Sequence, residues 1–244
     1  MHGFIPSRRR GVVAIILASV ALCSAPASWS QTAGGSPVKI GIIGTGKIGG
    51  ALARHWVKAG HEVFVSSRHP EELQGLVAEL GPRAHAGTPK QAAAFGTVVV
   101  VSIPYAAMPQ IGNDLRAELA GKVILDTSNP VERRDGAMAL DAQKKGAGVA
   151  TAEFLHNTRI VRAFNCIPAA TLANEANHQP ERFAIPIGGD DPAALKIAEQ
   201  LVRETGFDPV LVGSLAKTRE FDLGQPLAKG GATAAEMRRM VANH

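Results

Sequence analysis

The chain has 244 residues, of which 45% are hydrophobic, 19% charged and 5% aromatic. This length suits one domain with a small appendage, and the composition excludes a disordered chain, a coiled coil and a collagen-like fibre. Three arginines in residues 1–30 contribute to the formal charge of +5, and the rest of the chain carries only +2, which is no footprint of nucleic-acid binding.

Residues 1–30 have the three-part order of an export signal. Arg8, Arg9 and Arg10 precede an apolar run at 11–23, which is shorter than the ~18–20 residues that cross a bilayer, and small residues follow at cleavage spacing. We expect export to the periplasm by the twin-arginine or Sec route, with an uncleaved anchor as the alternative. Residues 31–37 predict a linker, and residues 38–244 the folded domain without a further membrane span.

Beyond residue 37, short β-branched runs alternate with helical patterns. Strands are expected at 38–43, 62–66, 84–87, 98–101, 122–126, 159–164, 183–187 and 209–212. Helices are expected at 47–59, 70–80, 88–95, 137–157 with a break near 146–148, 192–204 and 233–242. Pro186 would confine its strand to a sheet edge. The alternation predicts an α/β fold with a Rossmann-type, doubly wound parallel sheet.

Residues 44–49, Gly-Thr-Gly-Lys-Ile-Gly, follow the first expected strand and open the first helix. In that context GxGxxG is a dinucleotide fingerprint. Gly44 permits the tight turn, Gly46 lets the backbone approach a pyrophosphate, and Gly49 lets the helix pack close to the strand. The N–H groups at the helix start would then bind the phosphates. The alternative is a glycine turn without a ligand.

Ser66, Ser67 and Arg68 end the second expected strand, where NAD-binding sites place an acid. An acid would repel a ribose 2′-phosphate, whereas two hydroxyls and a guanidinium donate hydrogen bonds to it. These residues therefore predict NADP(H). His69 either adds a donor or is an ordinary surface histidine.

Several motifs in order resemble those of the NADPH-dependent coenzyme F420 reductase family, which shares its Rossmann domain with pyrroline-5-carboxylate reductases. The motifs lie at 42–53, 59–63, 66–68, 121–130, 161–168, 187–191, 206–210 and 213–216, within residues 38–242. The resemblance implies a small C-terminal α/β lobe and hydride transfer between NADP(H) and a flavin-like ring. A related domain supplies electrons in membrane metalloreductases, where a flavin takes the hydride.

The family's binding positions carry over where the motifs match. They are Thr45, Lys47 and Ile48 at the pyrophosphate, Ser67 and Arg68 at the 2′-phosphate, Ser102, Ile103 and Pro104 along the cofactor, and Asn129 and Asn165 near the nicotinamide and acceptor. Either asparagine could instead be a turn former. Tyr105 either closes over the cofactor or packs on the following helix. Cys166 is expected to be a buried, inert thiol, with a position near the ring as the alternative.

We therefore predict an NADP-dependent oxidoreductase whose acceptor is a flavin, a deazaflavin such as coenzyme F420, or a small carbonyl or imine. No catalytic side chain is assigned, because the cofactor carries the chemistry, and the histidines show no metal spacing. The alternatives are a dinucleotide-binding module without turnover and an imine reductase of the pyrroline-5-carboxylate reductase type. That type needs a helical domain where this chain has the β-type runs 183–187 and 209–212. A homodimer is compatible with either enzyme.

Overall fold

One sheet of eight strands, in the order β3-β2-β1-β4-β5-β6-β7-β8, organises the computed structural model. The structure describes residues 1–3 and 36–243; the rest of the predicted signal and most of the linker lie outside the described residues. The strands are β1 (Lys39–Ile43), β2 (Glu62–Ser66), β3 (Ala84–Gly87), β4 (Val98–Val101), β5 (Val123–Asp126), β6 (Arg159–Arg162), β7 (Ala184–Gly189) and β8 (Asp208–Gly213).

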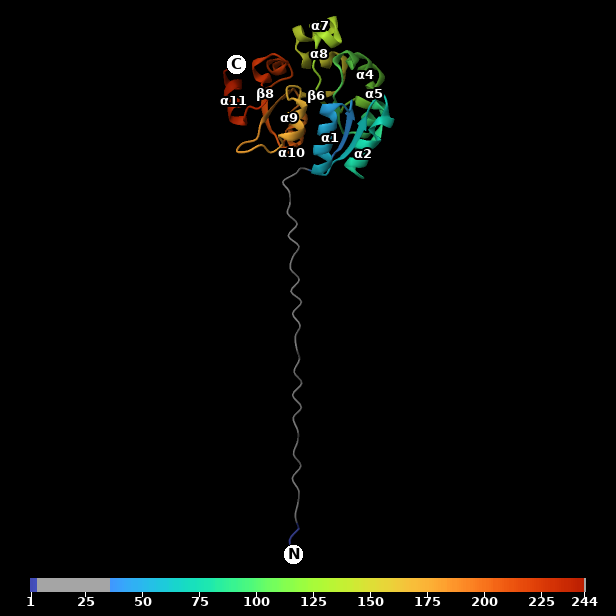
Figure 1. Cartoon of the computed structure of the whole chain (residues 1–244), viewed down its shortest axis with the longest axis vertical. Coiled ribbons are helices and arrows are strands. Elements are labelled where there is room, and N and C mark those ends of the chain that lie inside the picture. The colour runs from blue at the N-terminus through green and yellow to red at the C-terminus, as the bar shows by residue number, and fades with distance from the viewer. Residues whose placement is uncertain (4–35, 244) are drawn as a thin grey trace. The chain divides into compact units, whose positions relative to one another are not determined.

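Helices cover both faces of this sheet (Figure 1). They are α1 (Lys47–Ala59), α2 (Gln74–Leu80), α3 (Pro89–Phe95), α4 (Met108–Asp114), α5 (Arg116–Leu119), α6 (Glu132–Asp135), α7 (Ala137–Lys145), α8 (Ala147–Phe154), α9 (Ala169–Asn174), α10 (Pro192–Glu204) and α11 (Ala234–Ala242). The 3-10 helices are η1 (Pro70–Leu73), η2 (Tyr105–Ala107), η3 (Ala216–Phe221) and η4 (Pro226–Ala228).

Two apolar cores, one on each face of the sheet, hold the layers together, and a third cluster in the C-terminal part contains Phe221, Leu227 and Met237. Leu52 and Trp56 of α1 and Leu201 of α10 are buried in the first core, with Val98 and Val100 of β4. Val99 and Val101 of the same strand are buried in the second core, with side chains of α4, α5 and α8. A run of four valines suits this position, because a strand covered on both faces has no polar side.

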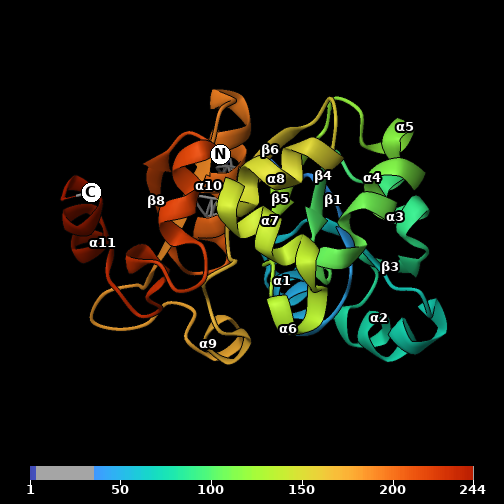
Figure 2. The ribbon, with the colours of Figure 1, turned by 90° about the horizontal axis from the view of Figure 1, so that it is seen from above.

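The doubly wound α/β prediction is confirmed. Strands β1 to β6 are parallel, and the chain crosses from one side of β1 to the other between β3 and β4, so the switch point lies between β1 and β4. Residues beyond β6 form the predicted C-terminal lobe, with α9, β8 and α11 on the side of the sheet away from α2 and α5 (Figure 2). In the described residues no helix is long and apolar enough to span a membrane.

The lobe departs from the prediction in two ways. Strand β7 is antiparallel to β6, so the sheet is not parallel throughout. The expectation of an edge strand at Pro186 is wrong, because β7 lies between β6 and β8. Proline is tolerated there because the ladder with β6 involves only Gly188 and Gly189, so at Pro186 the strand pairs with β8 alone.

Candidate dinucleotide site

The three glycines of the elbow between β1 and α1 have different neighbours. Gly44 has φ +90°, and a Cβ there would collide with the Ser102 carbonyl oxygen. A Cβ at Gly49 would collide with the Gly44 carbonyl oxygen. At Gly46, by contrast, a Cβ would meet no atom of the described residues within 4 Å. The fold itself therefore requires the first and third glycines, whereas the second leaves space of the kind that a closely approaching ligand fills.

The amino end of α1 is open to an anion. Gly46 is the N-cap and supplies no side-chain cap, and the first turn contains no acidic residue. The first N–H groups of a helix lack intrahelical partners and carry a partial positive charge. Thr45 fixes the elbow to the end of β2, because its hydroxyl donates to the Ser66 carbonyl and accepts from the Ser66 N–H, both at 3.0 Å. The residues present thus fit a pyrophosphate group.

A cavity of about 790 Å³, which we call the elbow cavity, opens at the carboxyl ends of β1, β2 and β4. Of the predicted residues, those that line it are Gly44, Thr45, Gly46, Ser67, Arg68, Ile103 and Pro104. The sequence did not identify further lining residues on the α3 and α4 side, which include Thr88, Lys90, Gln110, Ile111 and Leu115. The size lies within the range of small-molecule sites.

The other predicted residues do not line the elbow cavity. Ser66 is fully buried and its hydroxyl donates to the Ile42 carbonyl at 2.7 Å, so it supports the elbow from inside. Ser102 continues the sheet through its N–H, which bonds the Ile43 carbonyl at 2.9 Å. Lys47 lines a separate groove between α1 and α9, and Ile48 and Gly49 contribute backbone at the helix start.

Two cations stand at the rim of the elbow cavity. Arg68 is exposed, and among the described residues it has no hydrogen-bond or ion-pair partner. Lys90 has an exposed side chain, and among the described residues its one ion pair is with the largely covered Glu118, at 3.3 Å. His69 does not line the cavity and lies 3.4 Å from Glu71, so the surface-histidine interpretation holds. The capping box of Thr88 and Gln91 marks the start of α3 directly after β3. This signal could have identified Lys90, in the first turn of α3, as a candidate lining residue.

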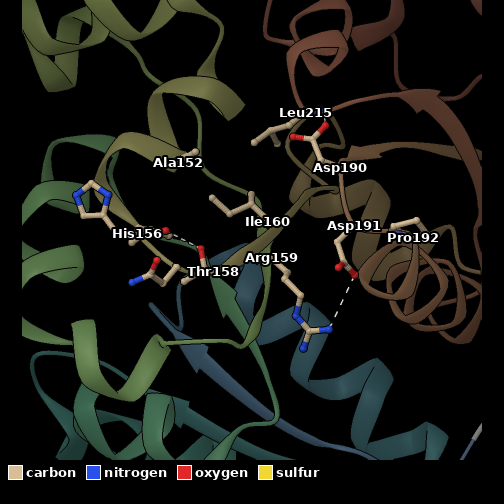
Figure 3. A pocket seen from close by; sticks show the side chains of 11 residues that line it. Ala152, His156, Thr158, Arg159, Ile160, Asp190, Asp191, Pro192 and Leu215 are labelled. Atoms are coloured by element: carbon tan, nitrogen blue, oxygen red, sulfur yellow. Dashed lines mark hydrogen bonds and ion pairs between the residues drawn. The ribbon is translucent and has the colours of Figure 1, made fainter.

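A second cavity, of about 430 Å³, lies at the amino end of β6, whereas the elbow cavity lies at the carboxyl ends of its strands (Figure 3). Its polar groups already serve the fold. Asp190 accepts from the Leu215 N–H at 2.9 Å, and Asp191 caps α10 through the Ala194 N–H at 2.7 Å and lies 3.9 Å from Arg159. None of the predicted site residues lines it.

Asn129 and Asn165 lie side by side beyond the carboxyl ends of β5 and β6. Asn129 Nδ2 donates to the Asn165 carbonyl at 2.6 Å, and Asn165 Nδ2 donates to Asn129 Oδ1 at 3.3 Å and to the Phe221 carbonyl at 2.9 Å. The two side chains and the Phe221 carbonyl form what we call the amide clasp. Strand β6 was predicted to end at residue 164 but ends at Arg162. Phe164 cannot belong to the strand, because its φ of +60° lies in the left-handed region.

Beneath the amide clasp, Asp126, Arg162 and Asp222 form a buried ion network. The fully buried Arg162 guanidinium donates to Asp126 at 3.0 Å, to the Ser128 carbonyl at 2.8 Å and to Asp222 at 2.9 Å. Burial raises the pKa of Asp222 even though Arg162 opposes this. Sequence reasoning missed the network, since 60 residues separate Arg162 from Asp222.

Tyr105 and Cys166 are buried side chains that do not line the elbow cavity. Tyr105 is fully buried, its hydroxyl donates to the Ala147 carbonyl at 3.3 Å, and burial raises its pKa to about 12. It therefore packs on α8 rather than closing over the elbow cavity. Cys166 is buried as predicted, and burial raises the pKa of its thiol to about 11.

Comparisons with known proteins find reductases of similar sequence. Residues 39–130 match the family described as NADP oxidoreductase, coenzyme F420-dependent. Metalloreductase STEAP3 of Rattus norvegicus is 30% identical over 187 residues, which span 75% of this chain and 36% of that protein. The F420-dependent NADP reductase of Methanothermobacter thermautotrophicus is 29% identical over 204 residues, 78% of this chain and 87% of that enzyme.

The matched residues 39–130 contain the elbow and every residue that lines the elbow cavity. The resemblance and the NADP(H) cofactor predicted from the sequence are thereby confirmed, and the chain is an NADP-dependent oxidoreductase. The crystal structure of hypothetical protein SMa0349 from Sinorhizobium meliloti shares its fold, with a TM-score of 0.71, 26% identity and coverage of 81% of this chain and 96% of that one. The chain spans about a third of the length of the rat metalloreductase, so the activity of that whole protein does not transfer with the match.

Proposed function

We propose that this oxidoreductase passes hydride from NADPH to a flavin or deazaflavin ring such as coenzyme F420. The observation that carries the cofactor side is the elbow cavity, where the space over Gly46 adjoins an uncapped helix start and where Arg68 has no partner within residues 1–3 and 36–243. When bound, the nicotinamide supplies the hydride. The protein's task is to hold two rings in contact and keep them oriented.

The carboxyl ends of β5 and β6 favour a flavin-type ring over an imine or a carbonyl. Reduction of an imine or carbonyl needs a positioned proton donor at the reacting group. Here Asp126 and Arg162 are fully buried and bonded to one another, and Tyr105 is buried with its pKa raised to about 12. A flavin-type ring has less need of such a donor, because its reduced nitrogen can be protonated from water. The name of one relative, an F420-dependent NADP reductase, supports the same acceptor class.

Anaerobic turnover of the full chain tests this proposal. NADPH is mixed with FMN, with coenzyme F420 or with a cyclic imine, and its absorbance at 340 nm is followed. We expect oxidation with FMN or coenzyme F420 and none with the imine. Turnover with the imine alone would identify an imine reductase instead. Tight NADPH binding without turnover on any acceptor would identify a binding module and contradict the proposal.

We also propose that residues 1–30 export the enzyme, on the support of the basic start, the apolar run and the small residues described above. Cell fractionation with mass analysis of the recovered chain tests this. A shortened chain in the periplasm is expected, and a full-length chain in the cytoplasm would contradict it.

A further inference from the structure

The elbow cavity extends beyond the residues that serve the phosphates. Gly46 and the start of α1 fit the pyrophosphate, and Arg68 lies where the 2′-phosphate is expected. The remaining lining residues come largely from the α3 and α4 side, and the sequence did not identify them. A dinucleotide held at the elbow by its phosphates has one further group on that half, the purine base. The α3 and α4 side of the cavity is therefore the space available to the base.

One face of α4 is turned towards the elbow cavity. Ala107, which directly precedes α4, lines the cavity together with Gln110, Ile111 and Asp114. These residues follow one another at the spacings of three and four that bring helical side chains onto a single face. Asp114 therefore lies on the face that meets the cavity, and it shares this face with Gln110 one turn earlier.

The carboxylate of Asp114 has no structural role that accounts for it. The residue is exposed, and among the described residues its side chain makes no ion pair and no hydrogen bond. Lys90, the lysine on the α3 side of the cavity, pairs with Glu118 instead. Asp114 is also the last residue of α4, where a negative charge is unfavourable because the carboxyl end of a helix is itself partly negative. Its carboxylate is thus an acceptor available to a ligand in the cavity.

Apolar side chains line the same cavity. They are Ile103, after β4, and Ile111 and Leu115, in and after α4. Adenine has the complementary chemistry, because its flat rings have apolar faces and its 6-amino group is a hydrogen-bond donor at the edge. Pockets for such ligands combine apolar walls with a few placed polar groups that fix the orientation.

We propose that the α3 and α4 side of the elbow cavity binds the adenine base, and that the Asp114 carboxylate accepts a hydrogen bond from its 6-amino group. Asp114 is then a specificity-determining residue that selects a 6-aminopurine over a 6-oxopurine. The oxo group offers no donor at that position and would bring an oxygen against the carboxylate. This inference rests on the NADP(H) cofactor of the proposed function and holds for any hydride acceptor.

A cofactor analogue tests this bond without any change in the protein. Nicotinamide hypoxanthine dinucleotide phosphate carries a 6-oxo group in place of the 6-amino group of NADP⁺. Calorimetric titration of the full chain is expected to show NADP⁺ binding at least ~10-fold more tightly than this analogue. In Asp114→Asn the two ligands are expected to bind within about threefold of each other, because an amide can accept from the amino group or donate to the oxo group.

The matched control is Asp141→Asn, which removes the same charge from an exposed residue of α7 that does not line the elbow cavity. It is expected to keep the wild-type preference. Equal affinities in the wild type, or a preference that survives in Asp114→Asn, would overturn the inference. If NADP⁺ itself fails to bind the wild type, the proposed function fails as well. If NADP⁺ binds and the analogue binds equally well, only the role of Asp114 fails. Should Asp114→Asn not fold, the wild-type comparison decides.

Discussion

The elbow cavity and the buried ion network lie at the same edge of the sheet, yet their polar groups are used differently. At the elbow cavity, the part of the chain that the structure describes supplies no partner to Arg68 or to the first N–H groups of α1, and none of its atoms lies within 4 Å of a Cβ built at Gly46. In the ion network, Arg162 is fully buried and divides its bonds among Asp126, Ser128 and Asp222. The elbow cavity is arranged to bind an anionic ligand, whereas the ion network holds the segments around the amide clasp in place.

The largest expected effect comes from breaking the ion network. Arg162→Met leaves Asp126 and Asp222 as buried charges without a counterion, so we expect the free energy of unfolding to fall by about 3–5 kcal/mol. The matched control is Arg54→Met, which breaks a pair with Glu79 whose side chains are half exposed and which should cost under about 1 kcal/mol. Urea unfolding measures both. Similar losses in the two variants would contradict the contrast between the regions.

The elbow cavity should behave in the opposite way. Gly46→Val fills the space meant for the pyrophosphate, so we expect NADPH affinity to fall by about 100-fold. The free energy of unfolding should change by no more than about 1 kcal/mol, since only the N-cap preference is affected. Gly44→Ala is the control, because φ +90° and the Ser102 carbonyl make it lose stability as well. A destabilised Gly46→Val that still binds NADPH would refute this assignment.

Tyr105 gives a smaller effect, confined to alkaline pH. It is the only tyrosine, and burial raises its pKa from 10 to about 12 in the folded chain. Between pH 10 and 12 the unfolded chain releases this proton and the folded chain keeps it, so stability falls as pH rises, by up to about 3 kcal/mol. Tyrosinate absorbance at 295 nm should show the delayed titration, and Tyr105→Phe should lose that part of the pH dependence. A wild-type midpoint near 10 would contradict burial of the hydroxyl.

The two regions also differ in how far their sequence predicts them. The elbow is local: six residues, flanked by an apolar strand and a helix start, predict both its geometry and its ligand class. Even there the sequence could not show that the Ser66 hydroxyl is used by the Ile42 carbonyl. The sequence did not predict α4 and α5, because Pro109 and Gly112 interrupt the helical pattern in residues 105–119.

The C-terminal lobe depends on contacts between distant residues. The direction of β7 is set by its packing, not by its own sequence, and the pairing of Arg162 with Asp222 joins elements 60 residues apart. The proximity of Asn129 and Asn165 was expected only through the family resemblance. That Arg162 Nε and Asn165 Oδ1 lack partners among the described residues could be seen only from the geometry around them.

We expect the elbow cavity to select a dinucleotide bearing a 2′-phosphate through Arg68. Calorimetric titration of the full chain with NADPH and with NADH, in the wild type and in Arg68→Asp, tests it most directly. We expect the wild type to bind NADPH at least ~10-fold more tightly than NADH, and the variant to prefer NADH, since the added carboxylate repels the phosphate and accepts from the ribose hydroxyl. An NADPH-to-NADH affinity ratio that is the same in both proteins would contradict the claim.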